Sequence, residues 1–405
     1  MLVINKNAVR AAYPRELQRI LCIAEARRTR DWLSAWPMLA KQPTPLWSLP
    51  DTAQALGVAG VCAKDESKRS TLGSFKALGA PAALVRLVLR AHPAWDPKAV
   101  LLGAHAAALR GQVVISATDG NHGRALAAAA QGAGMRCVIV LHRQVSLERE
   151  SAIAAFGAEI VRTQGNYDAS VTHAAALAQA HGWQVVSDTS YAGYEDIPRD
   201  VMQGYGTLVD EVFEQGEAPF THVVVQGGVG GLAAGVASYF WERQGTQRPT
   251  LIVAEPRQAD CLLQSALSGQ PAHATGTVDS VMAGLACGES SPLAWRFLQP
   301  SVDVFMTIED DDAIDAMRRL ARGSARDVPI ESGESGAAGL AALRVLALSP
   351  AHRAQAGLDA HSRVLLINTE GATAPLVYRQ LTGLDAREVR RRQADWLLAQ
   401  GTVAR

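Results

Sequence analysis

The stretch that decides the fold runs from residue 221 to residue 231 and reads Thr221-His222-Val223-Val224-Val225-Gln226-Gly227-Gly228-Val229-Gly230-Gly231. Its first half is a short apolar run, which predicts a strand that is buried on both faces. Its second half is a glycine turn, and an apolar helical pattern follows directly. A strand that passes through such a turn into a helix is typical of parallel α/β sheets, whose ligands bind beyond the carboxyl ends of the strands.

The same alternation of strand and helix recurs along the chain. Apolar runs predict strands at 61–65, 112–116, 137–141, 159–161, 184–187, 250–254 and 363–367. Helical spacing predicts helices at 14–39, 74–89, 122–132, 147–156, 167–181 and 202–215. The fold class is therefore α/β, with parallel-rich twisted sheets flanked by helices. Because 405 residues exceed one ordinary core, we expect two domains.

Composition and charge exclude several classes of function. The 39 basic and 39 acidic residues cancel, so no electrostatic footprint for nucleic acid or an anionic membrane is present. No apolar run reaches the length of about 18 residues that a transmembrane helix needs, and residues 1–10 hold no apolar signal segment. We expect a cytoplasmic protein that acts on a small molecule.

A lysine stands at the start of the predicted helix 74–89, in Gly73-Ser74-Phe75-Lys76-Ala77-Leu78-Gly79-Ala80. The N-terminal end of a helix carries a partial positive charge, which disfavours a cation. This position therefore favours a neutral Lys76 amine, the form that acts as a nucleophile. An ordinary surface lysine is the alternative interpretation.

Two other segments complete one kind of site. The loop Ser116-Ala117-Thr118-Asp119-Gly120-Asn121-His122-Gly123 lies between a strand and a helix, where backbone N–H groups bind anions. The glycine turn at 227–231 offers a cradle for a phosphate. A cofactor with an aldehyde, a ring and a phosphate uses all three segments, and pyridoxal 5′-phosphate fits. The rival interpretation is a loose dinucleotide motif, formed by Gly228, Gly230 and Ala233 with Glu255, which predicts NAD and leaves Lys76 without a role.

The chain resembles the fold-type II pyridoxal phosphate enzymes at Ser74-Phe75-Lys76 and Gly120-Asn121-His122-Gly123. It resembles the diaminopropionate ammonia-lyase family in particular, from about residue 40 to about 380, in 118–124, 166–168, 186–189, 203–205, 282–289 and 332–337. The resemblance implies a tryptophan synthase β-like fold and a homodimer. We expect 1–85 and 205–405 to form a larger cofactor-binding domain, and 86–204 a smaller, mobile substrate-binding domain.

The resemblance also assigns the residues that hold the cofactor. Lys76, which follows Phe75, binds the cofactor aldehyde as an imine, and the Asn121 side chain contacts its phenolic oxygen. The turn 227–231 holds the phosphate. Thr369, in Ile367-Asn368-Thr369-Glu370-Gly371, meets the pyridine nitrogen, and such a neutral partner favours elimination over transamination.

The substrate residues follow from the same family. The loop that includes Thr118 and His122 binds the substrate carboxylate. Asp119 stands where dehydratases carry a small residue, and Asp188 follows a predicted strand and faces the same cleft. Two carboxylates suit a dicationic amino acid, and Asp188 with Tyr167 recognises its β-substituent. An ordinary helix N-cap is the alternative role for Asp119.

The expected reaction is an amino-acid catabolic one, the α,β-elimination of 2,3-diaminopropionate to pyruvate and ammonia. Lys76 removes the α-proton of the L-isomer and Asp119, on the opposite face, that of the D-isomer. The alternatives are a hydroxy-amino-acid dehydratase of the serine/threonine type or another fold-type II β-elimination or replacement enzyme, and a non-catalytic sensor. The five cysteines show no metal-binding spacing, so no metal is expected. Cys261 and Cys287, which match family cysteines, are buried thiols or a disulfide.

Overall fold

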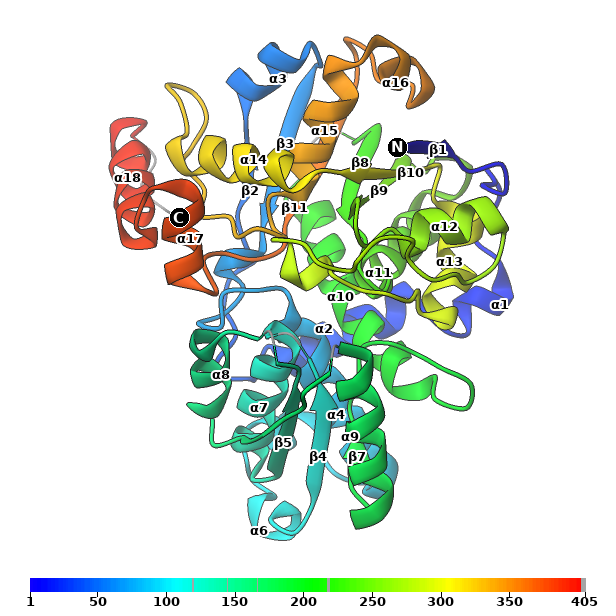
Figure 1. The fold of residues 1–405 in the computed structure, drawn as a ribbon, viewed down its shortest axis with the longest axis vertical. Helices are drawn as coiled ribbons and strands as arrows, with labels where there is room; N and C mark the ends of the chain where they lie inside the picture. Colours follow the sequence, from blue (N-terminus) through cyan, green and yellow to red (C-terminus); the bar gives the residue numbers. More distant parts are fainter. Residues whose placement is uncertain (119, 144, 166, 217–218, 402–405) are drawn as a thin grey trace.

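The buried strands assemble into two separate sheets. The structure is a computed structural model, and it describes residues 1–118, 120–143, 145–165, 167–216 and 219–401. A seven-stranded sheet draws its strands from both ends of the chain, and a four-stranded sheet draws its strands from the middle. Figure 1 shows the larger sheet in the upper half of the view and the smaller sheet below it.

The larger sheet is parallel except at its two edges. Its strand order is β1-β10-β9-β8-β11-β3-β2, and β1 and β2 are the antiparallel strands. Side chains of β8 alternate between its faces, so that Val223 and Val225 join one apolar core and Val224 the other. The strands are β1 (Leu2–Ile4), β2 (Leu46–Ser48), β3 (Gly60–Asp65), β8 (His222–Gln226), β9 (Thr250–Pro256), β10 (Val304–Ile308) and β11 (Arg363–Asn368).

The smaller sheet is parallel throughout. Its order is β6-β5-β4-β7, formed by β4 (Val113–Ala117), β5 (Arg136–Leu141), β6 (Glu159–Arg162) and β7 (Gln184–Val185). On β4, Val114 faces the core shared with the rest of the molecule, and Val113 and Ile115 face a separate cluster under helix α9 (Tyr167–His181). Both faces are therefore covered, as parallel sheets require.

Helices cover both faces of each sheet. The α-helices are α1 (Arg15–Gln18), α2 (Ile23–Leu33), α3 (Pro50–Leu56), α4 (Lys76–Ala91), α5 (Pro97–Leu101), α6 (Ala106–Leu109), α7 (Asn121–Ala133), α8 (Leu147–Ala154), α9, α10 (Asp196–Glu214), α11 (Gly231–Gln244), α12 (Cys261–Ser268), α13 (Pro292–Ser301), α14 (Asp310–Arg322), α15 (Ala338–Leu348), α16 (Pro350–Gln355), α17 (Pro375–Thr382) and α18 (Ala386–Ala399). The 3₁₀ turns are η1 (Glu66–Lys68), η2 (Gly245–Gln247) and η3 (Ala283–Leu285). Within the described part of the chain, no helix combines the length and apolarity that crossing a membrane requires.

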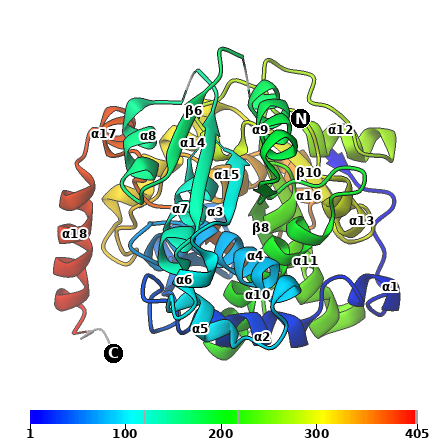
Figure 2. The ribbon, with the colours of Figure 1, turned by 90° about the horizontal axis from the view of Figure 1, so that it is seen from below.

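The chain enters the smaller sheet through α4 and leaves it through α10, and these two helices pack against each other. Figure 2 shows them together beside α2 and α11. At their crossing, a Cβ atom on Gly204 would lie 2.1 Å from the carbonyl oxygen of Leu78. Only a residue without a side chain fits this contact, so the helices approach closely.

A buried charge network holds the segment between β3 and α4 that leads to Lys76. The Arg69 guanidinium, 1 % exposed, pairs with Glu66 at 2.8 Å and with Glu211 of α10 at 2.6 Å. Lys64 pairs with Glu211 at 2.7 Å. Buried ions that are paired in this way fix a segment, because any movement would leave a charge without its partner.

The fold class is as predicted from the sequence, and two predicted helices differ in extent. The predicted helix 14–39 is wrong as one piece, because Cys22 takes an extended conformation between α1 and α2 and its backbone N–H donates to Gln203 at 3.2 Å. The helix predicted at 202–215 begins earlier, at Asp196. Strands β1, β2 and β10 are additional to those predicted. The division into two domains at 85 and 205 stays a prediction.

Candidate active site

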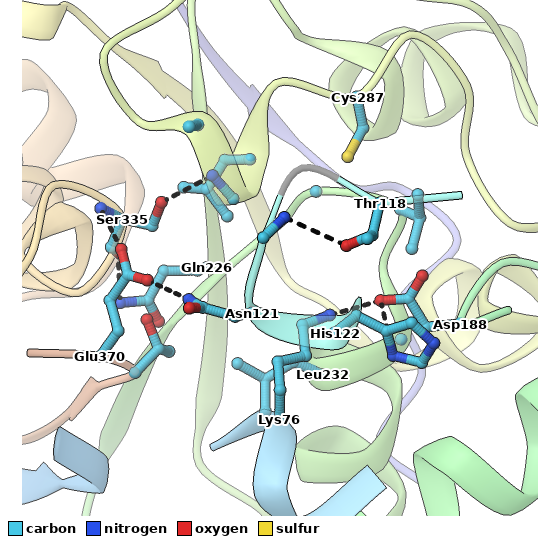
Figure 3. A pocket seen from close by; sticks show the side chains of 18 of the residues that line it. Lys76, Thr118, Asn121, His122, Asp188, Gln226, Leu232, Cys287, Ser335 and Glu370 are labelled. Atoms are coloured by element: carbon cyan, nitrogen blue, oxygen red, sulfur yellow. Dashed lines mark hydrogen bonds and ion pairs between the residues drawn. The ribbon is translucent and has the colours of Figure 1, made fainter. Parts of the chain in front are cut away.

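Loops from both sheets line one pocket at the junction between them. It is bordered by the start of α4, the loop between β4 and α7, the segment after β7, the glycine turn after β8 and the segment after β11. In parallel sheets these are the carboxyl ends of the strands, where ligands bind. Figure 3 shows side chains from these segments converging on the pocket.

Lys76 is the first residue of α4, and its ammonium group is hydrogen-bonded to the Asp188 carboxylate. Burial alone would strongly lower the pKa of Lys76, but the charge and hydrogen bond of Asp188, together with contributions from Tyr205 and Cys287, outweigh burial and hold the pKa above its ordinary value. Conversely, burial would raise the pKa of Asp188, and Lys76 holds it below its usual range. The expectation of a neutral Lys76 is therefore wrong for the cofactor-free chain, because the sequence did not reveal this ion pair.

His122 and Thr118 shape the loop that carries Asn121. The His122 ring donates from Nε2 to the Val186 carbonyl at 2.9 Å, and its Nδ1 lies 3.9 Å from the Asp188 carboxylate. Burial lowers the pKa of His122, which keeps the ring neutral. The Thr118 hydroxyl accepts from the N–H groups of Gly120 at 3.2 Å and Gly123 at 3.3 Å.

Asn121 begins α7 and donates its side-chain N–H to the Glu370 carboxylate. Figure 3 shows this contact on the opposite side of the pocket from Asp188. Glu370 is only 4 % exposed and follows Thr369, a pocket residue whose carbonyl accepts from the backbone N–H of Phe75 at 3.0 Å. The Lys76 segment and the Thr369 segment are thus bonded together.

The glycine turn fits a phosphate group. Gly227, Gly228, Val229 and Gly231 line the pocket. Gly230 has φ +98° and packs below the turn, where a Cβ atom would lie 2.9 Å from Leu298 Cδ1. The turn opens α11, whose N-terminus has no side-chain cap, so its first N–H groups are available to an anion.

Three buried polar atoms of the pocket lack a hydrogen-bond partner within the described residues. They are the Gln226 side-chain oxygen, the Tyr205 hydroxyl and His122 Nδ1. The Tyr205 ring packs on Phe75 at 4.8 Å between centroids, and its centroid lies 5.9 Å from Lys76 Nζ. Unpaired buried polar atoms are costly, so they fit a site that a polar ligand fills. Together with the lysine and the glycine turn, they fit pyridoxal phosphate.

Glu255, the acidic residue that the NAD interpretation requires, is not available to bind a ribose. Glu255, at the end of β9, is fully buried and accepts from the backbone N–H groups of Leu262 at 2.9 Å and Leu263 at 2.8 Å. Burial raises the pKa of Glu255 to about 8. This carboxyl group caps α12 instead of facing a ribose, and a Cβ atom on Gly227 would lie 2.6 Å from its Cγ.

The predicted site residues that the structure describes converge on this pocket, except Gly230, which packs below the glycine turn. Phe75, Lys76, Thr118, Asn121, His122, Tyr167, Asp188 and Thr369 all line it. Asp119 and Asn166 lie outside the described residues. The pocket is also lined by four residues to which the sequence assigns no role, Tyr205, Gln226, Arg149 and Glu370. Of these, only Glu370 could have been found from the sequence, because it is adjacent to the predicted Thr369.

Cys261 and Cys287 lie in different environments. Cys261 carries a free thiol and lies 3.5 Å from the Gly228 carbonyl and 3.6 Å from Glu255 Oε1. Burial raises the pKa of Cys261 well above its ordinary value. Cys287 lines the pocket. The disulfide interpretation is therefore not realised in this structure.

Comparison with known proteins agrees with this geometry. Residues 38–370 match the family model described as pyridoxal-phosphate dependent enzyme. The diaminopropionate ammonia-lyase of Escherichia coli K12 is 40 % identical over 347 residues, which cover 84 % of this chain and 87 % of that protein. The enzyme of the same name from Salmonella typhimurium is 39 % identical over 353 residues, with the same coverage of 84 % and 87 %.

A solved structure extends the agreement to the fold. The crystal structure of the Escherichia coli diaminopropionate ammonia-lyase in complex with an aminoacrylate-PLP azomethine reaction intermediate superposes with a TM-score of 0.85. The two chains are 36 % identical, and the match covers 94 % of this chain and 96 % of that one. The chain therefore belongs to the pyridoxal-phosphate-dependent enzymes and, within them, to the diaminopropionate ammonia-lyase family.

Proposed function

We propose that this enzyme eliminates ammonia from 2,3-diaminopropionate and releases pyruvate and ammonia. The observation that carries the proposal is the contact between Lys76 and Asp188, which places an amine and a carboxylate side by side in the pocket. A lysine supplies the covalent hold on an aldehyde cofactor. The neighbouring carboxylate suits a substrate that carries a second cationic amine.

Each described residue has a defined part in holding the cofactor and the substrate. Pyridoxal phosphate, when bound, withdraws electrons from the bonds to the substrate α-carbon and so makes its proton removable. Lys76 would hold the cofactor, Asn121 and Thr369 would contact its ring, and residues 227–231 would hold its phosphate. The loop that contains Thr118 would bind the substrate carboxylate through backbone N–H groups.

Lys76 would then move the α-proton, and Asp188 would hold the leaving amine. Once the substrate α-amine has taken its place at the cofactor, the free Lys76 amine would take the α-proton of the L-isomer. Asp188, with Tyr167, binds the β-ammonium group, which leaves as ammonia with the electrons of its bond to carbon. The electrons of the broken C–H bond form the new double bond. Water then replaces the remaining nitrogen, so each turnover yields one pyruvate and two ammonia molecules.

We propose the second base from the sequence alone. Asp119, which lies outside the described residues, would remove the α-proton of the D-isomer from the opposite face. Two bases on opposite faces would let one pocket eliminate from both isomers.

The proposal is tested by covalent trapping of the cofactor and by an assay of several substrates. The purified enzyme with pyridoxal phosphate is expected to be yellow, and borohydride is expected to fix the cofactor mass on the peptide that contains Lys76. Pyruvate release should be fastest with 2,3-diaminopropionate and slower with serine and threonine. Faster release from serine or threonine would assign a dehydratase, and a Lys76→Ala variant that still turns over would remove the proposed role of Lys76.

We also propose that the enzyme is a cytoplasmic homodimer and that residues 86–204 move as a unit toward the rest. Exposed apolar side chains such as Leu376 and Leu398, on helices near the C-terminus, support an assembly. Sedimentation at several concentrations would report a single dimer mass if the proposal holds. A monomer at every concentration would contradict it.

A further inference from the structure

Glu370 is a buried carboxylate in the pocket for which the proposed reaction has no use. It is 4 % exposed, and both of its oxygen atoms accept hydrogen bonds. Oε1 accepts from the backbone N–H of Ser335 at 3.1 Å, and Oε2 accepts from the Asn121 side chain and from the Thr373 hydroxyl at 3.4 Å. Figure 3 shows Glu370 between Ser335 and Asn121. A side chain held at both oxygens has a fixed position.

This fixed carboxylate selects one end of the Asn121 amide. The oxygen and nitrogen ends of a side-chain amide have nearly the same shape, so the hydrogen-bond network decides which end faces each neighbour. A carboxylate only accepts hydrogen bonds, so it can bind the Nδ2 end and not the Oδ1 end. Nδ2 carries two hydrogens, and Glu370 takes one of them.

A neighbouring ion pair lies next to Glu370. Glu334, 2 % exposed, is bonded to Arg149 of α8, which also lines the pocket. Burial and the charge of Glu370 raise the pKa of Glu334 to about 7, and Arg149 opposes this rise. The two glutamates therefore lie close enough to interact electrostatically.

We infer that Glu370 is a positioning residue that turns the N–H end of Asn121 toward the phenolic oxygen of the cofactor. The inference rests on the proposed function, in which Asn121 contacts that oxygen. A donor at this position stabilises the ionised phenolic oxygen, and an acceptor would stabilise its protonated form. The residue therefore acts on the cofactor through Asn121.

The experiment measures the absorption spectrum of the bound cofactor instead of the enzyme activity. The absorption spectra of the parent, Glu370→Ala and Glu370→Gln enzymes are recorded with saturating pyridoxal phosphate and no substrate. The ionised phenolic form absorbs in the visible and the protonated form in the near ultraviolet. We expect the ratio of visible to near-ultraviolet absorbance to fall about fivefold in Glu370→Ala, the change that the loss of one net hydrogen bond gives. Glu370→Gln should stay close to the parent, because its side-chain oxygen can still accept from Asn121.

Two controls separate orientation from stability. Asp327 is another buried acid, 7 % exposed, and it accepts from backbone N–H groups of α3 away from the pocket. Asp327→Ala should lower the unfolding temperature and leave the absorbance ratio unchanged. In an Asn121→Ala background, Glu370→Ala should add no further spectral change, since Asn121 transmits the effect.

The outcomes are distinguishable. A parent enzyme that stays colourless with pyridoxal phosphate would remove the proposed function itself. A yellow parent whose Glu370→Ala spectrum is the same, or whose Glu370→Gln spectrum matches Glu370→Ala, would overturn only the role of Glu370. A spectral change that persists in the Asn121→Ala background would also overturn it. If Glu370→Ala does not fold, Glu370→Met, which keeps most of the side-chain volume and removes both accepting oxygens, takes its place in the same comparisons with the same expected fall in the absorbance ratio.

Discussion

The ring of Tyr205 lies against Gly79, one turn after Lys76, so closely that a Cβ atom on Gly79 would come within 2.7 Å of the ring. The same ring packs on Phe75, the residue before Lys76. The Tyr205 ring thus packs beside the Lys76 segment, and this packing is possible because residue 79 has no side chain.

Replacing Gly79 should therefore harm the site although alanine is the better helix former. A glycine-to-alanine change in a helix normally stabilises it by about 1 kcal/mol, whereas overpacking a core costs about 1–3 kcal/mol. We expect Gly79→Ala to lower the free energy of unfolding, measured in urea, and to slow reaction of Lys76 with the cofactor. The matched control is Gly132→Ala, also inside a helix, whose added Cβ meets only Trp36 Nε1 at 3.8 Å and the Leu101 carbonyl oxygen at 3.9 Å. A Gly79→Ala enzyme as stable as the parent would contradict this packing.

A substitution in the glycine turn should weaken cofactor binding specifically. Gly230→Ala combines a positive φ with a clash against Leu298, whereas Gly269→Ala has a positive φ of +77° and nothing within 4 Å. The difference between the two variants reports mainly on the glycine turn, because both substitutions place a side chain on a left-handed backbone, at φ +98° and +77°. We expect the Kd for pyridoxal phosphate, from fluorescence titration, to rise about tenfold more in Gly230→Ala, which corresponds to about 1.4 kcal/mol. Equal effects would place the phosphate elsewhere.

The ion pair between Lys76 and Asp188 should stabilise the cofactor-free protein within a defined pH window. The raised pKa of Lys76 contributes stability that is complete below about 10.4 and is lost as the pH rises through the folded value. The lowered pKa of Asp188 contributes stability that is present above about 3.9 and is lost as the pH falls through the folded value. Between these limits, Asp188→Asn should cost about 3 kcal/mol, because it leaves the largely buried Lys76 unpaired.

Urea unfolding at pH 3, 5, 7 and 10 would measure that window. The cost of Asp188→Asn should be nearly constant from pH 5 to pH 10 and smaller at pH 3, where the unfolded chain takes up a proton at Asp188 more readily than the folded protein. The exposed pair of Lys98 and Asp31 gives the control, since Asp31→Asn removes a contact whose partners are 38 % and 63 % exposed and should change little. A cost of Asp188→Asn that is as large at pH 3 as at pH 7 would show that the charge of Asp188 is not its source.

Asp119→Asn should separate the two isomers of the substrate. If Asp119 is the base for the D-isomer, its loss reduces kcat/KM for D-2,3-diaminopropionate more than for the L-isomer. Lys76→Ala, as the reference, should abolish turnover of both. Equal losses on both isomers in Asp119→Asn would end the assignment of one base to each face.

The sequence predicts those parts of the structure that have a local signal. Long apolar runs such as β8 identify most of the parallel strands. β10, Val304–Ile308, carries the same apolar signal although it is not among the predicted strands. Strands β1 and β2 are three residues long and half-exposed, which is too short to show a period. Their places depend on the neighbouring strands with which they pair.

The residues of the site also fall into those with a local sequence signal and those without one. Lys76, Asn121 and the glycine turn follow strands in recognisable motifs, so the sequence places them. Tyr205 lies inside α10, and nothing near it in the chain indicates that its ring reaches the lysine. The raised pKa of Lys76 is not evident from the sequence for a related reason, since its partner Asp188 is 112 residues away. Contacts between distant segments determine both features.

The crossing of α4 and α10 at Leu78 and Gly204 ties together the two helices through which the chain enters and leaves the smaller sheet. The segment between them also touches the rest of the molecule elsewhere, for example where the backbone N–H of Ser190 donates to the Ser291 hydroxyl at 3.2 Å. A designer who transplants this segment into a relative therefore has to match the helix crossing and the contacts around the pocket together.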